Sequence, residues 1–144
     1  MQLSEQEIIR RQNLQKIIDL GINPYPPELF PVNAYAADIK RDFKPEEGNF
    51  QDVVVAGRMM SNRNMGKAAF AEIQDTSGRI QVYINRDNIC PGEDKRLYDE
   101  VFKHLLDLGD FIGVKGYTFV TKTGETSIHA HELILLSKSL KPLP

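Results

Sequence analysis

The pattern of hydrophobic and polar positions divides the chain into a helical, proline-rich N-terminal part and a strand-rich body. In the body, apolar residues that alternate with polar ones predict strands over residues 53–61, 68–75, 79–85, 111–121 and 126–136. Turn residues at 76–78 and 122–125 join two pairs of these strands into hairpins. Between the third and fourth strands, apolar residues at helical spacing predict a helix over 94–108 that ends before Gly109.

Three strands, a helix and two further strands are the order of a five-stranded Greek-key barrel of the OB type. We therefore predict a mainly β fold, with a helix between strands three and four. An amphipathic helix is expected to precede the barrel, because Ser4 and Glu7 form a capping box and Gly21 provides a stop. Arg10 and Arg11 are expected on the polar side of this helix.

The length of the chain is that of about one domain. Residues 22–35 contain four prolines and predict an extended connector after the first helix. We divide the chain into residues 1–50, the N-terminal helix and proline-rich connector, and residues 51–137, the OB-fold domain. Residues 138–144 are interpreted as the start of a linker to a domain that this chain lacks.

One aromatic residue is predicted on the solvent face of its strand. Ala69 and Ala71 alternate inward, which leaves Phe70 among outward polar side chains. On the next strand Gln81 and Tyr83 also point outward. Exposed rings beside planar amides are typical of surfaces that stack on an unpaired base and read its edge. On this pattern alone, a ring that packs under a loop or helix is an open alternative.

OB barrels bind ligands on strands two and three, between the loop that joins strands one and two and the loop that joins strands four and five. Four candidate binding residues meet on this surface, namely Arg63, Phe70, Gln81 and Glu125. Supporting RNA contacts are expected from Arg58, Lys67 and Tyr83, and a contact of Arg10 and Arg11 with an RNA backbone is left open. Taken singly, these residues equally fit a solvated basic loop and a hairpin turn. Their shared surface favours binding of single-stranded nucleic acid.

Composition limits the remaining functions. The formal net charge is −2, which excludes binding of polyanions through diffuse positive charge, so that a nucleic-acid site must be local. Cys90 is the only cysteine, which excludes an internal disulfide and a zinc site built on cysteine pairs. Neither an apolar run of membrane-spanning length nor a signal peptide is recognisable. We expect a cytoplasmic protein that does not bind membranes.

Catalytic and metal-binding patterns are weak. Gly57 and Gly66 do not have the spacing of a phosphate-binding loop, and Ala68 occupies the position of the hydroxyl residue. His129 and His131 share a strand face, but further ligands at suitable spacing are missing. We therefore expect no catalytic residue, no metal site and no cofactor in this chain.

Several short motifs match those of a known protein family, and they are too specific for a chance match. They lie at residues 55–60, 65–70, 73–75, 78–83, 108–110, 121–125 and 135–144. Together they resemble the N-terminal anticodon-binding domain of bacterial-type class II lysyl-tRNA synthetases. The resemblance covers nearly the whole chain and is weakest over residues 32–51 and 88–95.

The resemblance implies an OB-fold that binds the tRNA anticodon and precedes a class II catalytic domain. It assigns the stacking aromatic to Phe70, the base-reading amide to Gln81, the loop arginine to Arg63 and the turn carboxylate to Glu125. ATP and magnesium are implied only for the catalytic domain, so this chain is expected to be inactive alone. The full-length protein is implied to be a homodimer, and a monomer is allowed for this chain.

Three alternatives remain from the sequence. The corresponding domain of an aspartyl- or asparaginyl-tRNA synthetase shares the OB-fold binding surface, and its tRNA also has a central uridine in the anticodon. A free-standing OB protein would bind single strands without sequence preference. A protein-interaction OB domain would bind no RNA.

Overall fold

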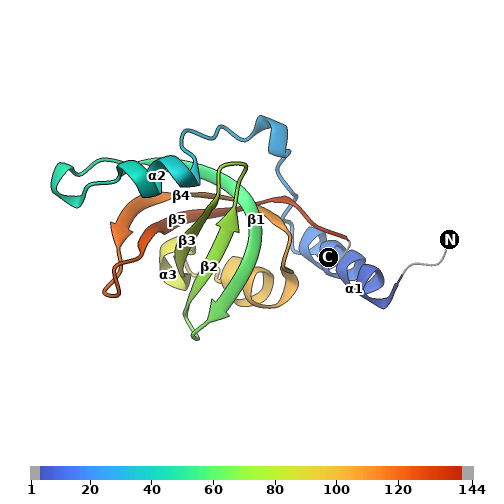
Figure 1. Ribbon diagram of the computed structural model, residues 1–144. Coiled ribbons are helices and arrows are strands. Elements are labelled where there is room, and N and C mark those ends of the chain that lie inside the picture. The colour runs from blue at the N-terminus through green and yellow to red at the C-terminus, as the bar shows by residue number, and fades with distance from the viewer. Residues whose placement is uncertain (1–3, 141–144) are drawn as a thin grey trace.

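A closed β-barrel forms the centre of the computed structural model, which describes residues 4–140 of the 144-residue chain (Figure 1). In the described residues its five strands are β1 (Val53–Asn64), β2 (Ala68–Gln74), β3 (Arg79–Asn85), β4 (Phe111–Val120) and β5 (Thr126–Ser137). Their order around the barrel is β1-β2-β3-β5-β4, with a parallel β3–β5 pair and antiparallel pairs elsewhere. The predicted five-stranded OB barrel is confirmed.

The alternation of side chains builds the core of this barrel. Strand β2 buries Ala69, Ala71 and Ile73 and turns Phe70 outward, as predicted. Strand β3 likewise buries its apolar positions, and inward side chains from all five strands meet in one cluster. Burying one large aliphatic side chain stabilises the fold by roughly 1.5–3 kcal/mol. The apolar face of each strand therefore turns inward, and the other face stays in solvent.

Strand β1 extends to Asn64, beyond its predicted end at residue 61. A register shift between Met59 and Ser61 inserts an extra residue, and pairing with β2 then continues through Arg63 opposite Phe70. The sequence from 62 to 64 is polar throughout and shows no alternation, which is why it predicted a loop. Arg63 is consequently held on a strand, and not on a loop as predicted.

The helix between strands three and four is confirmed, but its predicted bounds of 94–108 are wrong. The structure has a short helix α3 (Arg86–Ile89) and then a wide helix η3 (Leu97–Leu105). The wider winding is visible at its end, where the Leu106 N–H donates to the carbonyl of Val101, five residues back, at 2.9 Å. Leu108, the last residue of the predicted range, lies beyond the helix and is exposed.

Helix η3 contributes two stacked rings to the barrel core. Tyr98 and Phe102 are fully buried with ring centroids 5.5 Å apart. The Tyr98 hydroxyl donates to the carbonyl of Gly66 at 2.9 Å, which ties the helix to the β1–β2 turn. This contact fixes the turn at the end of β1 and β2.

The N-terminal part packs on the barrel. Helix α1 (Glu5–Asp19) begins as predicted, with the Glu7 N–H donating to the Ser4 hydroxyl at 3.2 Å. Two short 3₁₀ turns, η1 (Pro27–Leu29) and η2 (Pro45–Glu47), flank helix α2 (Ala36–Asp42). Ile39 of α2 is fully buried in the barrel core. The division of the chain at residue 50 stays a prediction.

Arg10 does not lie on a solvated face, which corrects the sequence interpretation. Its side chain is buried and donates at 3.1 Å to the carbonyls of both Leu108 and Ser139. On the same helix Ile18 is exposed, whereas Ile17 is fully buried against Val101 and Leu135. The guanidinium of Arg10 therefore joins α1 to the barrel and is not presented to an RNA backbone.

Replacing Arg10 with alanine is expected to destabilise the fold by about 1–3 kcal/mol, because two part-buried hydrogen bonds from a charged donor are lost. Arg11→Ala is the matched control, because Arg11 is exposed on the same helix. Urea unfolding of both variants measures the difference. Equal stability of the two variants would show that the Arg10 contacts contribute nothing to the fold.

The chain after β5 is also anchored to the barrel as far as it is described. Lys138 is buried, and its Nζ contacts Asp107 and lies 2.7 Å from Asp110 Oδ2. The Ser139 N–H donates to Asp110 Oδ1 at 2.7 Å. The assignment of residues 138–144 to a linker stays a prediction, and residues 141–144 lie outside the described residues.

Candidate nucleic-acid interface

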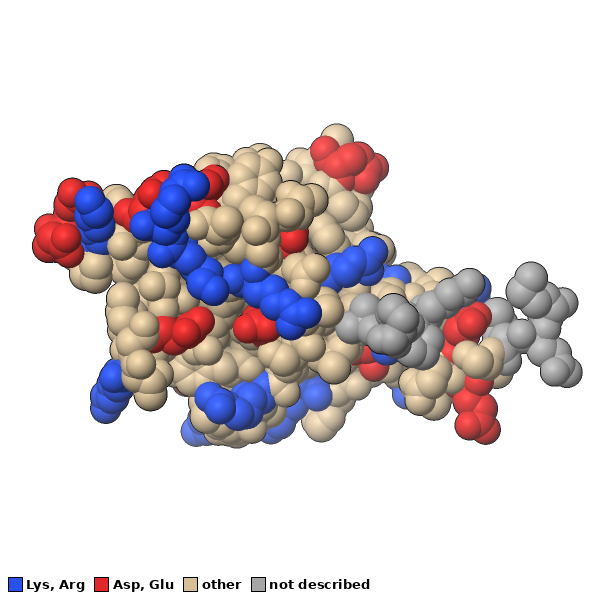
Figure 2. Space-filling model, in the orientation of Figure 1, with Lys and Arg blue, Asp and Glu red and all other residues tan. Residues whose placement is uncertain are grey.

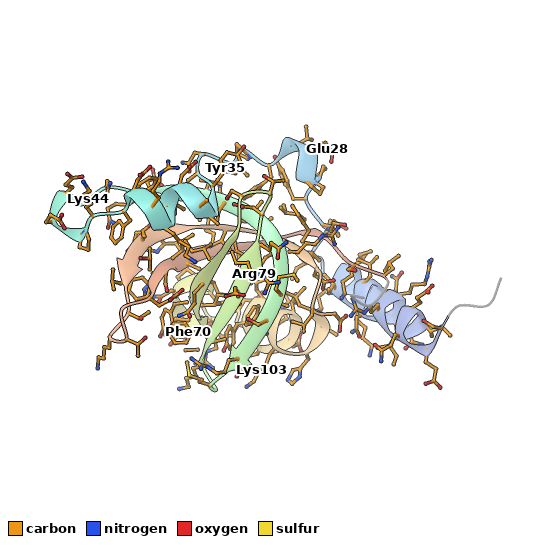
Figure 3. The ribbon with its side chains drawn as sticks, in the orientation of Figure 1. Glu28, Tyr35, Lys44, Phe70, Arg79 and Lys103 are labelled. Atoms are coloured by element: carbon orange, nitrogen blue, oxygen red, sulfur yellow. The ribbon has the colours of Figure 1, made fainter. Side chains whose placement is uncertain are left out.

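A row of mostly aromatic side chains crosses the outer wall of the barrel from strand to strand. Arg63 on β1 pairs with Phe70 on β2, which pairs with Tyr83 on β3. Tyr83 pairs in turn with His129 on β5, and His129 with Tyr117 on β4. We call Arg63, Phe70, Tyr83, His129 and Tyr117 the aromatic row. Figure 3 shows Phe70 on this wall, towards the end of the barrel opposite α2.

The rings of the aromatic row are in contact with one another. The Phe70 and Tyr83 centroids lie 5.2 Å apart at an interplanar angle of 52°. Tyr83 meets His129 edge to face at 5.0 Å, and His129 stacks on Tyr117 at 4.8 Å. The guanidinium carbon of Arg63 lies 5.6 Å from the Phe70 ring centre, within cation–π range. The row therefore offers several π-faces to a nucleic-acid strand.

A second row runs parallel to the aromatic row, two residues along each strand. Ser61 pairs with Glu72, and Glu72 with Gln81. We call these three side chains the polar row. Two residues of a strand span about 7 Å. A base stacked on Phe70 therefore presents its edge to the hydroxyl, carboxylate and amide of the polar row.

Two hollows flank this arrangement and share Arg63, Phe70 and Gln81. The smaller hollow, about 280 Å³, is lined in addition by Ser61, Ala71 and Glu72. The larger hollow, about 430 Å³, continues past Tyr83, Phe119 and His129 to Thr121, Lys122 and Thr123 of the β4–β5 turn. Because they share these three residues, the two hollows adjoin each other, as expected for consecutive unpaired nucleotides.

Hydrogen bonds fix His129 within the aromatic row. Its Nε2 lies 2.7 Å from Asn88 Oδ1, and its Nδ1 lies 3.0 Å from the Tyr117 hydroxyl. Burial, with a smaller contribution from His131, lowers the pKa of His129 below its usual value. The lowered pKa favours the neutral ring, and because Asn88 Oδ1 can only accept, the neutral tautomer that fits this contact carries its proton on Nε2. His129 thus contributes a polar ring to the aromatic row.

Basic side chains lie in the β1–β2 turn and in the β4–β5 turn. Figure 2 shows lysine and arginine atoms along the lower edge of the barrel, whereas higher on this face basic and acidic atoms are mixed. Lys67 in the β1–β2 turn and Lys122 in the β4–β5 turn are exposed. The overall negative charge is therefore compatible with a locally basic rim around the hollows.

The structure brings together some predicted site residues and separates others. Arg63, Phe70, Gln81 and Tyr83 line the hollows, and Lys67 lies in the adjacent turn. Glu125 is exposed in the β4–β5 turn and does not line either hollow as the described residues define them.

Arg58 lies elsewhere on the barrel. Its guanidinium donates to the Gly109 carbonyl at 3.1 Å and lies 6.0 Å from the Phe111 ring centre. These contacts place Arg58 in a separate hollow of about 220 Å³ with Gly109 and Phe111. The predicted RNA contact of Arg58 gains no support from this position.

Sequence reasoning missed several residues that line the hollows. Tyr117 and Phe119 alternate outward on β4, a signal that the same period-2 analysis applied to β2 and β3 would have found. His129 was weighed only as a metal ligand.

Among residues 4–140 no group of three or more histidine, cysteine, aspartate or glutamate side chains could hold a metal ion. Within the same range no helix is long and apolar enough to span a bilayer.

The family model of tRNA anticodon domains, described as OB-fold nucleic acid binding domain, matches residues 53–136. This chain belongs to that family. Curated relatives include the lysine–tRNA ligase of Porphyromonas gingivalis, which is 55% identical over 145 residues and covers 100% of this chain. The lysine–tRNA ligases of Azobacteroides pseudotrichonymphae and Christiangramia forsetii are 56% and 57% identical, and each covers 99% of it. The chain spans 25%, 28% and 24% of these three relatives, about a quarter of their length.

The family match coincides with the strands that carry both rows. Residues 53–136 run from the start of β1 into β5 and include all eight side chains of the aromatic and polar rows. The rows therefore lie within the part of the chain that is shared with nucleic acid binding domains.

Proposed function

We propose that this chain is the anticodon-recognition domain of a lysine–tRNA ligase. The observation that carries the proposal is the placement of Phe70 between two hollows, with the amide of Gln81 and the guanidinium of Arg63 lining both. The similarity to lysine–tRNA ligases along the whole chain favours lysine over the aspartyl and asparaginyl enzymes. A row of rings beside a basic rim favours a single-stranded nucleic acid, whose bases stack on the rings while its phosphates meet the cations.

In this proposal a loop base stacks on Phe70 and is read by the side chains around it. Uracil presents two carbonyl acceptors on either side of one imino donor. Arg63 carries donors only, and the amide of Gln81 can donate or accept, so the two side chains can satisfy both carbonyls. Because Arg63 already lies over the ring of Phe70, the incoming base takes the place of that contact.

In this proposal the chemical steps of aminoacylation belong to a different domain of the complete protein. Aminoacylation requires ATP and magnesium, which we assign to a class II catalytic domain outside this chain. We further propose that the complete protein is a homodimer. The 144-residue chain should show no lysine-dependent exchange of pyrophosphate into ATP.

Competition among RNA hairpins tests the proposed function. The wild-type chain should prefer a loop with a central uridine over one with a central cytidine, because the cytosine amino group faces side-chain donors at a cost of roughly 1–3 kcal/mol. Gln81→Ala should reduce this preference, whereas Gln12→Ala, which removes an exposed amide from helix α1, should not. Fluorescence anisotropy with both hairpins measures it.

Other outcomes of the competition separate the alternatives. Equal binding of all single-stranded loops would identify a non-specific OB protein. A preference for aspartate or asparagine anticodon loops over the lysine loop would identify the related synthetases. Absence of RNA binding would contradict the proposal altogether.

A further inference from the structure

Glu72 is the carboxylate that lies inside the smaller hollow. It projects from the same face of β2 as Phe70, between Ser61 on β1 and Gln81 on β3. Its side chain is 38% exposed, so a ligand can reach it while neighbouring side chains still orient it. Neither the sequence pattern nor the family resemblance assigned a role to this residue.

Arg79 orients the Glu72 side chain. Arg79 Nη1 donates to Glu72 Oε1 at 3.1 Å, and Arg79 Nε donates to Gln74 Oε1 at 2.8 Å. Within residues 4–140 the structure gives no hydrogen-bond donor to Glu72 Oε2. One carboxylate oxygen is thus bound from the side, and the other is available on the wall of the hollow.

Glu125 is placed differently. It is exposed in a turn whose hydrogen bonds involve its backbone, with its N–H donating to the Thr121 hydroxyl and its carbonyl accepting from the Thr121 N–H. The side chain of Glu125 does not line either hollow as the described residues define them. The acceptor nearest to Gln81 on the binding wall is therefore Glu72, its direct cross-strand partner.

We infer that Glu72 determines base specificity by accepting the imino N3–H of a uracil bound in the smaller hollow. This inference rests on the proposed function. Arg63, Glu72 and Gln81 then present donor, acceptor and donor groups, which complement the acceptor–donor–acceptor edge of uracil. Cytosine carries a lone pair at N3, which faces the carboxylate without a hydrogen.

Glu72→Gln is the informative substitution, because an amide can donate as well as accept. A glutamine at this position satisfies N3 of cytosine through its NH₂ group and N3–H of uracil through its carbonyl. The preference of wild type for the uridine hairpin over the cytidine hairpin should therefore fall by about tenfold, which corresponds to the loss of one buried mismatch. The fold should be unaffected, because the exposed Arg79–Glu72 pair contributes little.

The experiment compares wild type, Glu72→Gln, Glu125→Gln, Glu132→Gln and Phe70→Ala on the two hairpins, with thermal unfolding of each protein. Glu132→Gln is the matched control, since Glu132 is also a strand carboxylate in an exposed ion pair and lines neither hollow as the described residues define them. Glu125→Gln tests the turn carboxylate as the competing acceptor. We expect full uridine preference in Glu132→Gln and reduced preference in Glu72→Gln.

The other outcomes distinguish a failure of the inference about Glu72 from a failure of the proposed function. If Glu72→Gln retains the wild-type preference, or if Glu125→Gln loses it instead, the inference about Glu72 is wrong while the proposed function stands. If wild type binds neither hairpin, or binds both equally, the proposed function fails and the inference fails with it.

Discussion

Lys138→Met is expected to destabilise the protein by about 3–5 kcal/mol, because it leaves the buried carboxylate of Asp110 without its cation. The side chain of Lys138 is 1% exposed and that of Asp110 is 0% exposed, with 2.7 Å between Nζ and Oδ2. Asp110 retains two backbone donors, the N–H groups of Asp107 and Ser139, but these do not neutralise its charge. The loss should exceed that of any exposed lysine.

Urea unfolding measures this effect, with Lys122→Met as the control because Lys122 is exposed in the β4–β5 turn. The double variant Lys138→Met with Asp110→Asn should recover part of the loss, since it removes both charges of the pair. A Lys138→Met protein as stable as the Lys122→Met control would show that the ion pair is not needed. Such a result would also weaken the view that the segment after β5 belongs to the barrel.

The fold and half of the binding wall could be predicted from local sequence. Alternation on β2 and β3 placed Phe70, Gln81 and Tyr83 outside, and a short turn between the two strands placed Phe70 opposite Tyr83. Such predictions succeed because a residue two positions along a strand returns to the same face, whatever the rest of the molecule does.

The other half of the wall depends on long-range register. Tyr83 meets His129 only because β3 and β5 pair in parallel across the barrel closure, and no local pattern determines that offset. Arg63 reaches Phe70 because β1 contains an extra residue after Met59, which the polar sequence there does not reveal.

Arg10 shows the same limit at the N-terminus. Helical periodicity placed it on a polar face, yet that face packs against Leu108 and Ser139, which are distant in the sequence. A buried guanidinium is stable there because two carbonyls accept from it, and this condition is visible only in three dimensions.

Phe70→Ala should weaken binding of the uridine hairpin by roughly 1–3 kcal/mol, the value of one base–aromatic stack. Phe70 lines both hollows, so the loss should affect whichever nucleotide occupies either side. The fold should lose at most about 1.5 kcal/mol, because the outward ring contributes a contact with Tyr83 and little to the core.

Phe111→Ala provides a closely matched control for this prediction. Phe111 is also a half-buried, outward ring, and the Arg58 guanidinium carbon lies 6.0 Å from its centre, much as Arg63 lies near Phe70. Because Phe111 lines a separate hollow, its removal should leave hairpin affinity unchanged. Anisotropy titrations and urea unfolding of both variants give the comparison. Equal losses of affinity would mean that RNA follows a path past Arg58, whereas unfolding of Phe70→Ala alone would make its ring a structural element of the barrel wall.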